Sequence, residues 1–97
     1  MKLGRVIGTV WSTKKDENLV GMKFLIVRDL NLDYSEKNSF TVAVDSVGAG
    51  VGEVVLYASG SSARQTLLTK NRPVDAVIMA IVDKLDVAVK EALKSED

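Results

Sequence analysis

The chain has 97 residues, which is enough for one domain with a single modest core. Its 13 lysines and arginines balance 13 aspartates and glutamates, so it lacks the basic excess that is typical of nucleic-acid-binding proteins. It contains no cysteine and no histidine, which excludes disulfides, thiolate zinc sites, cysteine nucleophiles and Ser-His-Asp triads.

Nothing in the sequence indicates a membrane or a secretory route. Residues 1–5 lack the apolar core of a signal peptide, and no stretch approaches the ~20 apolar residues of a membrane span. We therefore expect a cytoplasmic protein with no membrane partner.

The first half of the chain predicts three strands. Residues 3–12 alternate loosely, and two glycines within them indicate bends of the kind found at barrel corners. Residues 21–30 predict a second strand that is apolar on both faces, and residues 31–38 predict a polar, mobile loop. Residues 39–45 alternate cleanly, which predicts a half-buried third strand. One face of that strand holds Phe40, Val42 and Val44, and the other holds Thr41, Ala43 and Asp45.

The second half predicts two further strands, at residues 53–58 and 74–82. Between them, a hydroxyl cap at Ser61 or Ser62 predicts a short helix over residues 63–68. The tail has the spacing of an amphipathic helix capped by Asp86. Its apolar positions are Leu85, Ala88, Val89, Ala92 and Leu93. We expect a barrel domain at residues 1–83 and a helical tail at residues 84–97.

Five short strands with one brief helix between the fourth and fifth predict a mainly β protein, a small closed or partly closed β-barrel. The second and fifth strands are apolar on both faces, yet a barrel of this size has only one inside. The surplus apolar faces predict packing against another subunit. Alternatively the tail helix covers one of these faces, and both arrangements are compatible.

The glycine-rich segment at residues 48–52 has the spacing of a phosphate-binding loop. Such a loop must follow a strand and open a helix, whose N-terminus then faces the phosphate. Here the apolar, β-branched residues 53–58 follow, so the glycines predict a tight turn between two strands rather than a nucleotide site.

Several sequence motifs occur together and in order over residues 2–83. They are Gly4-Arg5-Val6-Ile7-Gly8, Leu19-Val20-Gly21-Met22-Lys23, the run from Val44 to Glu53, Ser59-Gly60-Ser61-Ser62-Ala63-Arg64, Pro73-Val74-Asp75-Ala76-Val77-Ile78 and Ile81-Val82-Asp83. In this combination the chain resembles the EutN/CcmL family, the vertex proteins of bacterial microcompartment shells. It departs from the family pattern at Ala80, where glycine is expected, and after Asp83.

The resemblance implies a five-stranded barrel of the oligonucleotide-binding-fold type that assembles as a homopentamer. Such pentamers occupy the fivefold corners of a polyhedral shell in the cytoplasm, whose flat facets are hexameric shell proteins. It also implies that the glycine turn shapes a subunit contact. Candidates for the subunit interface or for an axial pore are Asp45, Val47, Gly48, Gly50, Gly52, Glu53, Gly60, Ser61, Ser62 and Arg64.

Each polar candidate also has a plain structural interpretation. Glu53 has no partner base or metal in the sequence and is expected to anchor a hydrogen bond or salt bridge. Asp45 is expected to accept turn hydrogen bonds, and Asp83 to accept bonds at the end of its strand. Arg64 either pairs with Glu53 or Asp45, within the chain or across a subunit boundary, or is an exposed surface arginine. The serines of residues 59–62 either cap a helix or hold a small anion at the pore.

We therefore expect a structural shell protein with no enzymatic activity, no cofactor, no metal and no nucleic-acid partner. The alternative is a barrel that binds single-stranded nucleic acid, with the single tryptophan, Trp11, stacking on a base. The zero net charge counts against this alternative, and an apolar packing role is expected for Trp11.

Overall fold

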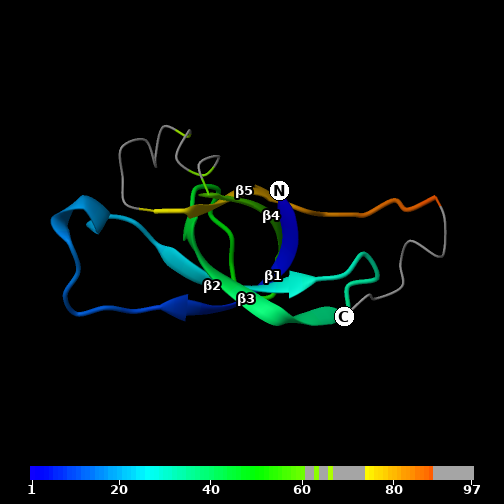
Figure 1. Ribbon diagram of the computed structural model, residues 1–97, viewed down its shortest axis with the longest axis horizontal. Coiled ribbons are helices and arrows are strands. Elements are labelled where there is room, and N and C mark those ends of the chain that lie inside the picture. The colour runs from blue at the N-terminus through cyan, green and yellow to red at the C-terminus, as the bar shows by residue number, and fades with distance from the viewer. Residues whose placement is uncertain (61–62, 64–65, 67–73, 89–97) are drawn as a thin grey trace.

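The computed structural model describes residues 1–60, 63, 66 and 74–88, and in this part of the chain it contains five strands and one short 3-10 helix (Figure 1). They are β1 (Lys2–Val10), η1 (Glu17–Leu19), β2 (Phe24–Leu30), β3 (Glu36–Asp45), β4 (Val54–Ser59) and β5 (Ala76–Ile81). Each predicted strand is present, with ends that differ by a few residues. The predicted helix at residues 63–68 lies almost wholly outside the described residues.

The five strands close into a barrel in the order β1-β2-β3-β5-β4, which confirms the predicted fold class. All neighbouring pairs are antiparallel except β3 with β5, which run parallel. One edge of β1 pairs with β2 and the other with β4, and the register shifts between Val6 and Gly8. A bulge at Ile7 bends β1 at this point. The bend helps β1 to pair with both of its neighbours, and this pairing closes the barrel.

The barrel interior is filled by alternate side chains of all five strands. This inner core consists of Val6, Leu25, Val27, Ala43, Ala49, Val55, Tyr57, Ala76 and Ile78, with Ile81 packed against it. Gly4 also belongs to the inside, where a Cβ atom would lie 2.3 Å from Val27 Cγ1. The interior is therefore a packed core rather than a pore.

A second apolar cluster covers one outer corner of the barrel. The outward side chains of Val44, Ala58 and Val77 are buried beneath Met22, Ala63 and Val74. Part of the surplus apolar surface predicted from the fifth strand is thus covered by connecting segments of the same chain.

The prediction of a loop that extends over residues 31–38 is wrong at its end. β3 already begins at Glu36, and the remaining residues form a hydrogen-bonded turn. Asn31 N donates to Ser35 O at 2.9 Å, and Ser35 N donates to Asp33 Oδ1 at 2.9 Å. The side-chain bond from Ser35 lowers the pKa of Asp33. Polar residues supply these bonds, so a polar sequence here produces an ordered turn.

After β5 the chain runs away from the barrel, on the side opposite the long connection between β1 and β2 (Figure 1). Residues 82–88 contain no helix, so Leu85, Asp86 and Ala88 do not form the first turn predicted for the tail. The remainder of that predicted helix, residues 89–97, lies outside the described residues.

Candidate subunit interface

The turn between β3 and β4 is built around the carboxylate of Asp45. Its Oδ1 accepts hydrogen bonds from the backbone N–H groups of Val47, Gly48 and Ala49, at 3.1, 3.1 and 3.2 Å. Convergent N–H groups of this kind form a concave nest that binds anions. The protein's own carboxylate fills the nest, as the strand-turn-strand context of these glycines predicts.

Glu53 closes the same turn from its other end. Its Oε1 accepts a hydrogen bond from Gly50 N at 2.7 Å, and its own N–H donates to Gly50 O at 3.1 Å. Gly52 N donates to Val6 O at 2.7 Å, which joins the turn to β1. Glu53 therefore acts as a hydrogen-bond anchor within the chain.

The glycines of this turn are not equivalent. Gly48 has a φ of +79° and Gly52 of +95°, a region that L side chains rarely adopt. Gly50 has no positive φ, and a Cβ atom there would meet only Glu53 Oε1, at 3.5 Å. A positive φ, which favours glycine, thus occurs at Gly48 but not at Gly50.

The anchored turn presents two apolar side chains to solvent. Val51 is 66% exposed and Val47 is 39% exposed. Lys23 stabilises the turn from the side, since its Nζ donates to Ala49 O at 3.3 Å and lies 4.0 Å from Asp45 Oδ2. The turn is therefore a preformed, partly apolar surface at the end of β3.

Of the second group of predicted candidates, the structure describes only Gly60. Its φ is +66°, and its N–H donates to Asp75 O at 2.7 Å, which joins the end of β4 to the start of β5. Ser61, Ser62 and Arg64 lie outside the described residues, so the predicted pairing of Arg64 does too.

A first apolar face covers the outside of β1, β2 and β3. Ile26 lies opposite Val42 on β3 and opposite Gly8 on β1, with the bulged Ile7 beside it. Phe40 extends the face along β3 and is 62% exposed, while Val42 is 43% exposed. The alternation predicted for β3 is present, but its smaller residues, Thr41 and Ala43, face the interior.

A second apolar face covers the outside of β1, β4 and β5. Leu3 pairs with Leu56, and Leu56 pairs with Ala80, so the three side chains form a row across the strands. Met79, which is 36% exposed, adjoins them at a bulge in β5. Since β2 is separated from β4 and β5 in the closed strand order, the two apolar faces lie on opposite sides of the barrel.

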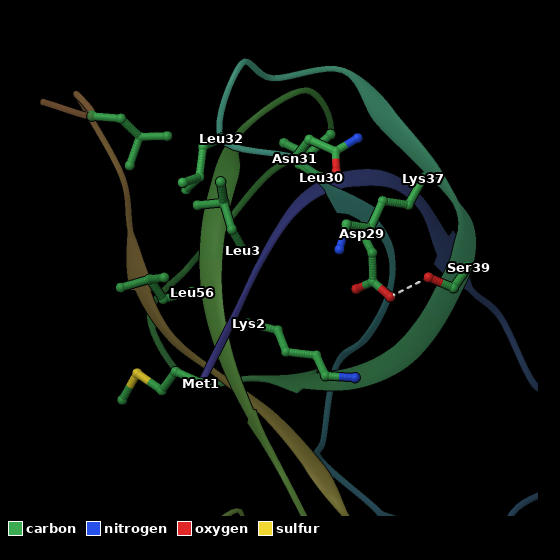
Figure 2. A pocket seen from close by; sticks show the side chains of 11 residues that line it. Met1, Lys2, Leu3, Asp29, Leu30, Asn31, Leu32, Lys37, Ser39 and Leu56 are labelled. Carbon is green, nitrogen blue, oxygen red and sulfur yellow. Dashed lines mark hydrogen bonds between the residues drawn. The ribbon is translucent and has the colours of Figure 1, made fainter. Parts of the chain in front are cut away.

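A hollow of about 610 Å³ opens at one end of the barrel and continues the second face. Figure 2 shows Leu3, Leu32 and Leu56 on one side of it and the polar groups of Asp29, Lys37 and Ser39 on the other. Its apolar lining is Met1, Leu3, Leu30, Leu32, Leu56 and Leu85.

The polar side of the hollow leads into a buried hydrogen-bond network. Asp29, which is 8% exposed, accepts hydrogen bonds from Tyr57 and from Ser39 Oγ, the latter at 2.6 Å. Thr41 Oγ1 lies 3.2 Å from the Tyr57 hydroxyl. Burial and the bond to Asp29 raise the pKa of Tyr57 to about 12. None of these residues belongs to a site predicted from the sequence, although an aspartate within the apolar residues 21–30 is a signal for a buried polar contact.

Trp11 does not pack against the barrel. Its side chain is 89% exposed just after β1, so the predicted packing role is wrong within a single chain. Nearby, Lys15 Nζ lies 5.5 Å from the centre of the Phe24 ring, a cation–π contact.

Among the described residues, no three acidic side chains come together in a group that could hold a metal ion. In the same part of the chain, no helix is long and apolar enough to cross a membrane.

Comparison with known proteins places these features in a family. The family profile described as "Ethanolamine utilisation protein EutN/carboxysome" matches residues 1–83. The carboxysome shell vertex protein CcmL of Gloeobacter violaceus is 40% identical over 97 residues, covering 100% of this chain and 97% of that protein. The bacterial microcompartment shell vertex protein PduN of Salmonella typhimurium is 47% identical over 89 residues, covering 88% of this chain and 98% of its own length.

Among solved structures, the barrel is similar to GrpN, a pentameric microcompartment shell protein from Rhodospirillum rubrum. The TM-score is 0.82 at 46% sequence identity, and the match covers 90% of this chain and 99% of that one. The family match, the two relatives and this shared barrel agree with the motifs found in the sequence. The chain therefore belongs to the EutN/CcmL family.

Proposed function

We propose that this protein is a structural component of a bacterial microcompartment shell, in which five copies form a ring at each vertex. The observation that carries the proposal is the pair of apolar faces, around Phe40 and around Leu56, on opposite sides of a small barrel. Exposed apolar faces of this kind mark protein–protein contacts. Its relatives are named as shell vertex proteins, and the similar GrpN structure is described as pentameric.

The role of such a protein depends on its shape. A flat sheet of hexameric shell proteins cannot close into a polyhedron, and a fivefold ring supplies the missing curvature at each corner. The partners of the ring are therefore the hexameric shell proteins around it, and its place is a shell within the cytoplasm.

The turn between β3 and β4 contributes to contacts around the ring or to its central pore. The residues of this turn that we place in the contact are Asp45, Val47, Gly48, Gly50, Gly52 and Glu53. The network of carboxylate and backbone hydrogen bonds holds this turn in one shape before assembly, which lowers the entropy lost on binding. The segment with Gly60, Ser61, Ser62 and Arg64 forms the second part of this proposed contact region.

Neither catalysis nor nucleic-acid binding is part of the proposed function. The carboxylates of Asp45, Glu53 and Asp29 are engaged in hydrogen bonds that stabilise the turn and the barrel interior. The chain has a formal net charge of zero, whereas binding to a phosphate backbone depends on basic residues.

Two measurements test the proposal. Native mass spectrometry of the purified protein should give a species of five 10.5 kDa chains, and a single chain at micromolar concentration would contradict it. Co-expression with hexameric shell proteins should give closed particles, and omission of this chain should leave open sheets or tubes. Closed particles in its absence would remove the vertex role.

A further inference from the structure

The two apolar faces differ in shape, and the difference indicates how copies of the chain meet. One face carries a protruding side chain, and the other adjoins a hollow. We call the four side chains Leu3, Leu32, Leu56 and Leu85 the leucine side of this hollow.

Phe40 is the protruding side chain. Among the large apolar side chains of the five strands it has the highest exposed fraction, 62%. It lies opposite Arg28 on β2, at the last pair before the register shift in this ladder, and Arg28 Nε donates to Lys37 O at 2.7 Å. Its backbone is therefore held in place before any partner binds. An exposed aromatic side chain on a rigid element is a common anchor of protein interfaces.

The hollow is suited to receive such an anchor. It has a volume of about 610 Å³, which is ample for a phenyl ring, and Leu3, Leu32 and Leu56 lie along one wall (Figure 2). Leu56 and Leu3 pair across β4 and β1, so this wall also belongs to the barrel and is preformed. Burial of apolar area here favours association.

Charged side chains lie beside both features. Glu36, whose side chain is 51% exposed, lies four residues before Phe40 on β3 and forms a long contact of 3.9 Å with Arg28, the residue opposite Phe40. Lys2 lines the hollow and is exposed. The side of Phe40 thus carries a half-exposed carboxylate in a long ion pair, and the hollow is lined by the ammonium groups of Lys2 and Lys37, with the carboxylate of Asp29 engaged by Ser39.

A ring of identical copies requires two different surfaces on each copy, because each subunit meets one neighbour with one surface and the other neighbour with another. We infer that Phe40 of one copy inserts into the leucine side of the hollow of the next copy, with Glu36 approaching the neighbour's Lys2. This inference rests on the proposed ring and identifies its contact. The occupant of the hollow is thus a second copy of this chain rather than a small ligand.

The first experiment compares four proteins by native mass spectrometry: the wild type, Phe40→Lys, Leu56→Glu and Val20→Lys. The last is a matched control, because Val20 is 65% exposed and lies outside both faces. Wild type and Val20→Lys should be pentamers. Phe40→Lys, which brings a second cation towards Lys2, and Leu56→Glu should be single chains with an unchanged circular dichroism spectrum.

If wild type is a pentamer and both charged variants are pentamers too, the inference is overturned while the proposed function stands. If wild type is itself a single chain, the proposed function fails. Where a charged variant loses its circular dichroism signal, Phe40→Ala and Leu56→Ala replace it, and each should raise the concentration of half-dissociation about tenfold or more.

The second experiment tests whether the two residues contact each other. Phe40→Ala, Leu56→Ala and the double variant form a double-mutant cycle for the assembly equilibrium. If the side chains meet, the double variant loses clearly less than the sum of the two single losses. Additive losses would overturn the contact, even if both residues lie in an interface.

Discussion

Tyr57 donates a hydrogen bond from its hydroxyl to the carboxylate of Asp29 inside the barrel, and this bond joins β4 to β2, which are not neighbours in the closed sheet. The bond links strands across the interior, whereas the backbone ladder links only adjacent ones. It also accounts for a buried aspartate in an otherwise apolar environment, because a buried carboxylate requires donors.

Removing the tyrosine hydroxyl should therefore destabilise the barrel. Tyr57→Phe removes one of two hydroxyl donors to Asp29 and should lower the free energy of unfolding by about 1–3 kcal/mol. Urea denaturation at a fixed protein concentration measures this, since assembly raises apparent stability. Tyr34→Phe, at a side chain that is 37% exposed, is the control and should change little. Equal stability of Tyr57→Phe and wild type would contradict the role of the bond.

The same bond predicts a loss of stability at high pH. Burial and the bond to Asp29 raise the pKa of Tyr57 from 10.0 to about 12 in the folded protein. The contribution of Tyr57 is therefore complete below the unfolded-state pKa and is lost as pH rises from about 10 towards 12. Urea midpoints across this range should fall more steeply for wild type than for Tyr57→Phe. If the urea midpoints of the two proteins fall in parallel, the loss of stability at high pH does not come from Tyr57.

The turn between β3 and β4 should tolerate substitution unequally. Gly48→Val forces a β-branched residue into a φ of +79° and should lower stability by about 1–3 kcal/mol and weaken assembly. Gly50→Ala is the matched control, because its backbone is unrestricted and a Cβ atom meets only ordinary contacts. Thermal unfolding and native mass spectrometry together check both effects. A Gly48→Val protein that unfolds and assembles as wild type does would refute the prediction.

Gly4 should also tolerate substitution poorly, but for a different reason, which is the close approach of β2. A Cβ atom at this position would lie 2.3 Å from Val27 Cγ1 and 2.8 Å from Arg28 O, so Gly4→Ala should destabilise by about 1–3 kcal/mol. At Gly8 the nearest atom is the flexible Ile26 Cδ1 at 3.4 Å, and Gly8→Ala should have a smaller effect. Denaturant unfolding of the two variants compares them, and an equal loss at both sites would argue against the packing explanation.

A mixture of two assembly-deficient variants should show the direction of the ring contact. Phe40→Lys retains the hollow, and Leu56→Lys retains the protruding side chain, so one intact contact forms between unlike chains, while the other contact would bring two lysines together. Native mass spectrometry of an equimolar mixture should give a 1:1 dimer that neither variant gives alone, with no larger ring. Closed pentamers in the mixture would contradict a head-to-tail contact of this kind.

The class of fold is predictable from the sequence because the signals for its strands and turns are local. Alternation along residues 39–45 and the glycines at residues 48–52 predict a strand and a strand-to-strand turn, and both are present. The loop predicted at residues 31–38 ends earlier in the structure, since polar residues are equally compatible with a hydrogen-bonded turn and with the exposed start of β3. The helical period of the tail was also a local signal, but residues 82–88 do not follow it.

By itself the sequence determined a single small β domain without histidine or cysteine chemistry, with more apolar surface than one barrel interior can bury. Only the tertiary structure decided which face of each strand is inside, because a pattern of period two defines two faces without choosing between them. In β3 the interior of a five-stranded barrel accommodates the small Thr41 and Ala43, which leaves Phe40 outside. Closure of the barrel, a contact between residues distant in sequence, then sets Phe40 and Leu56 on opposite sides and buries Asp29 beside Tyr57.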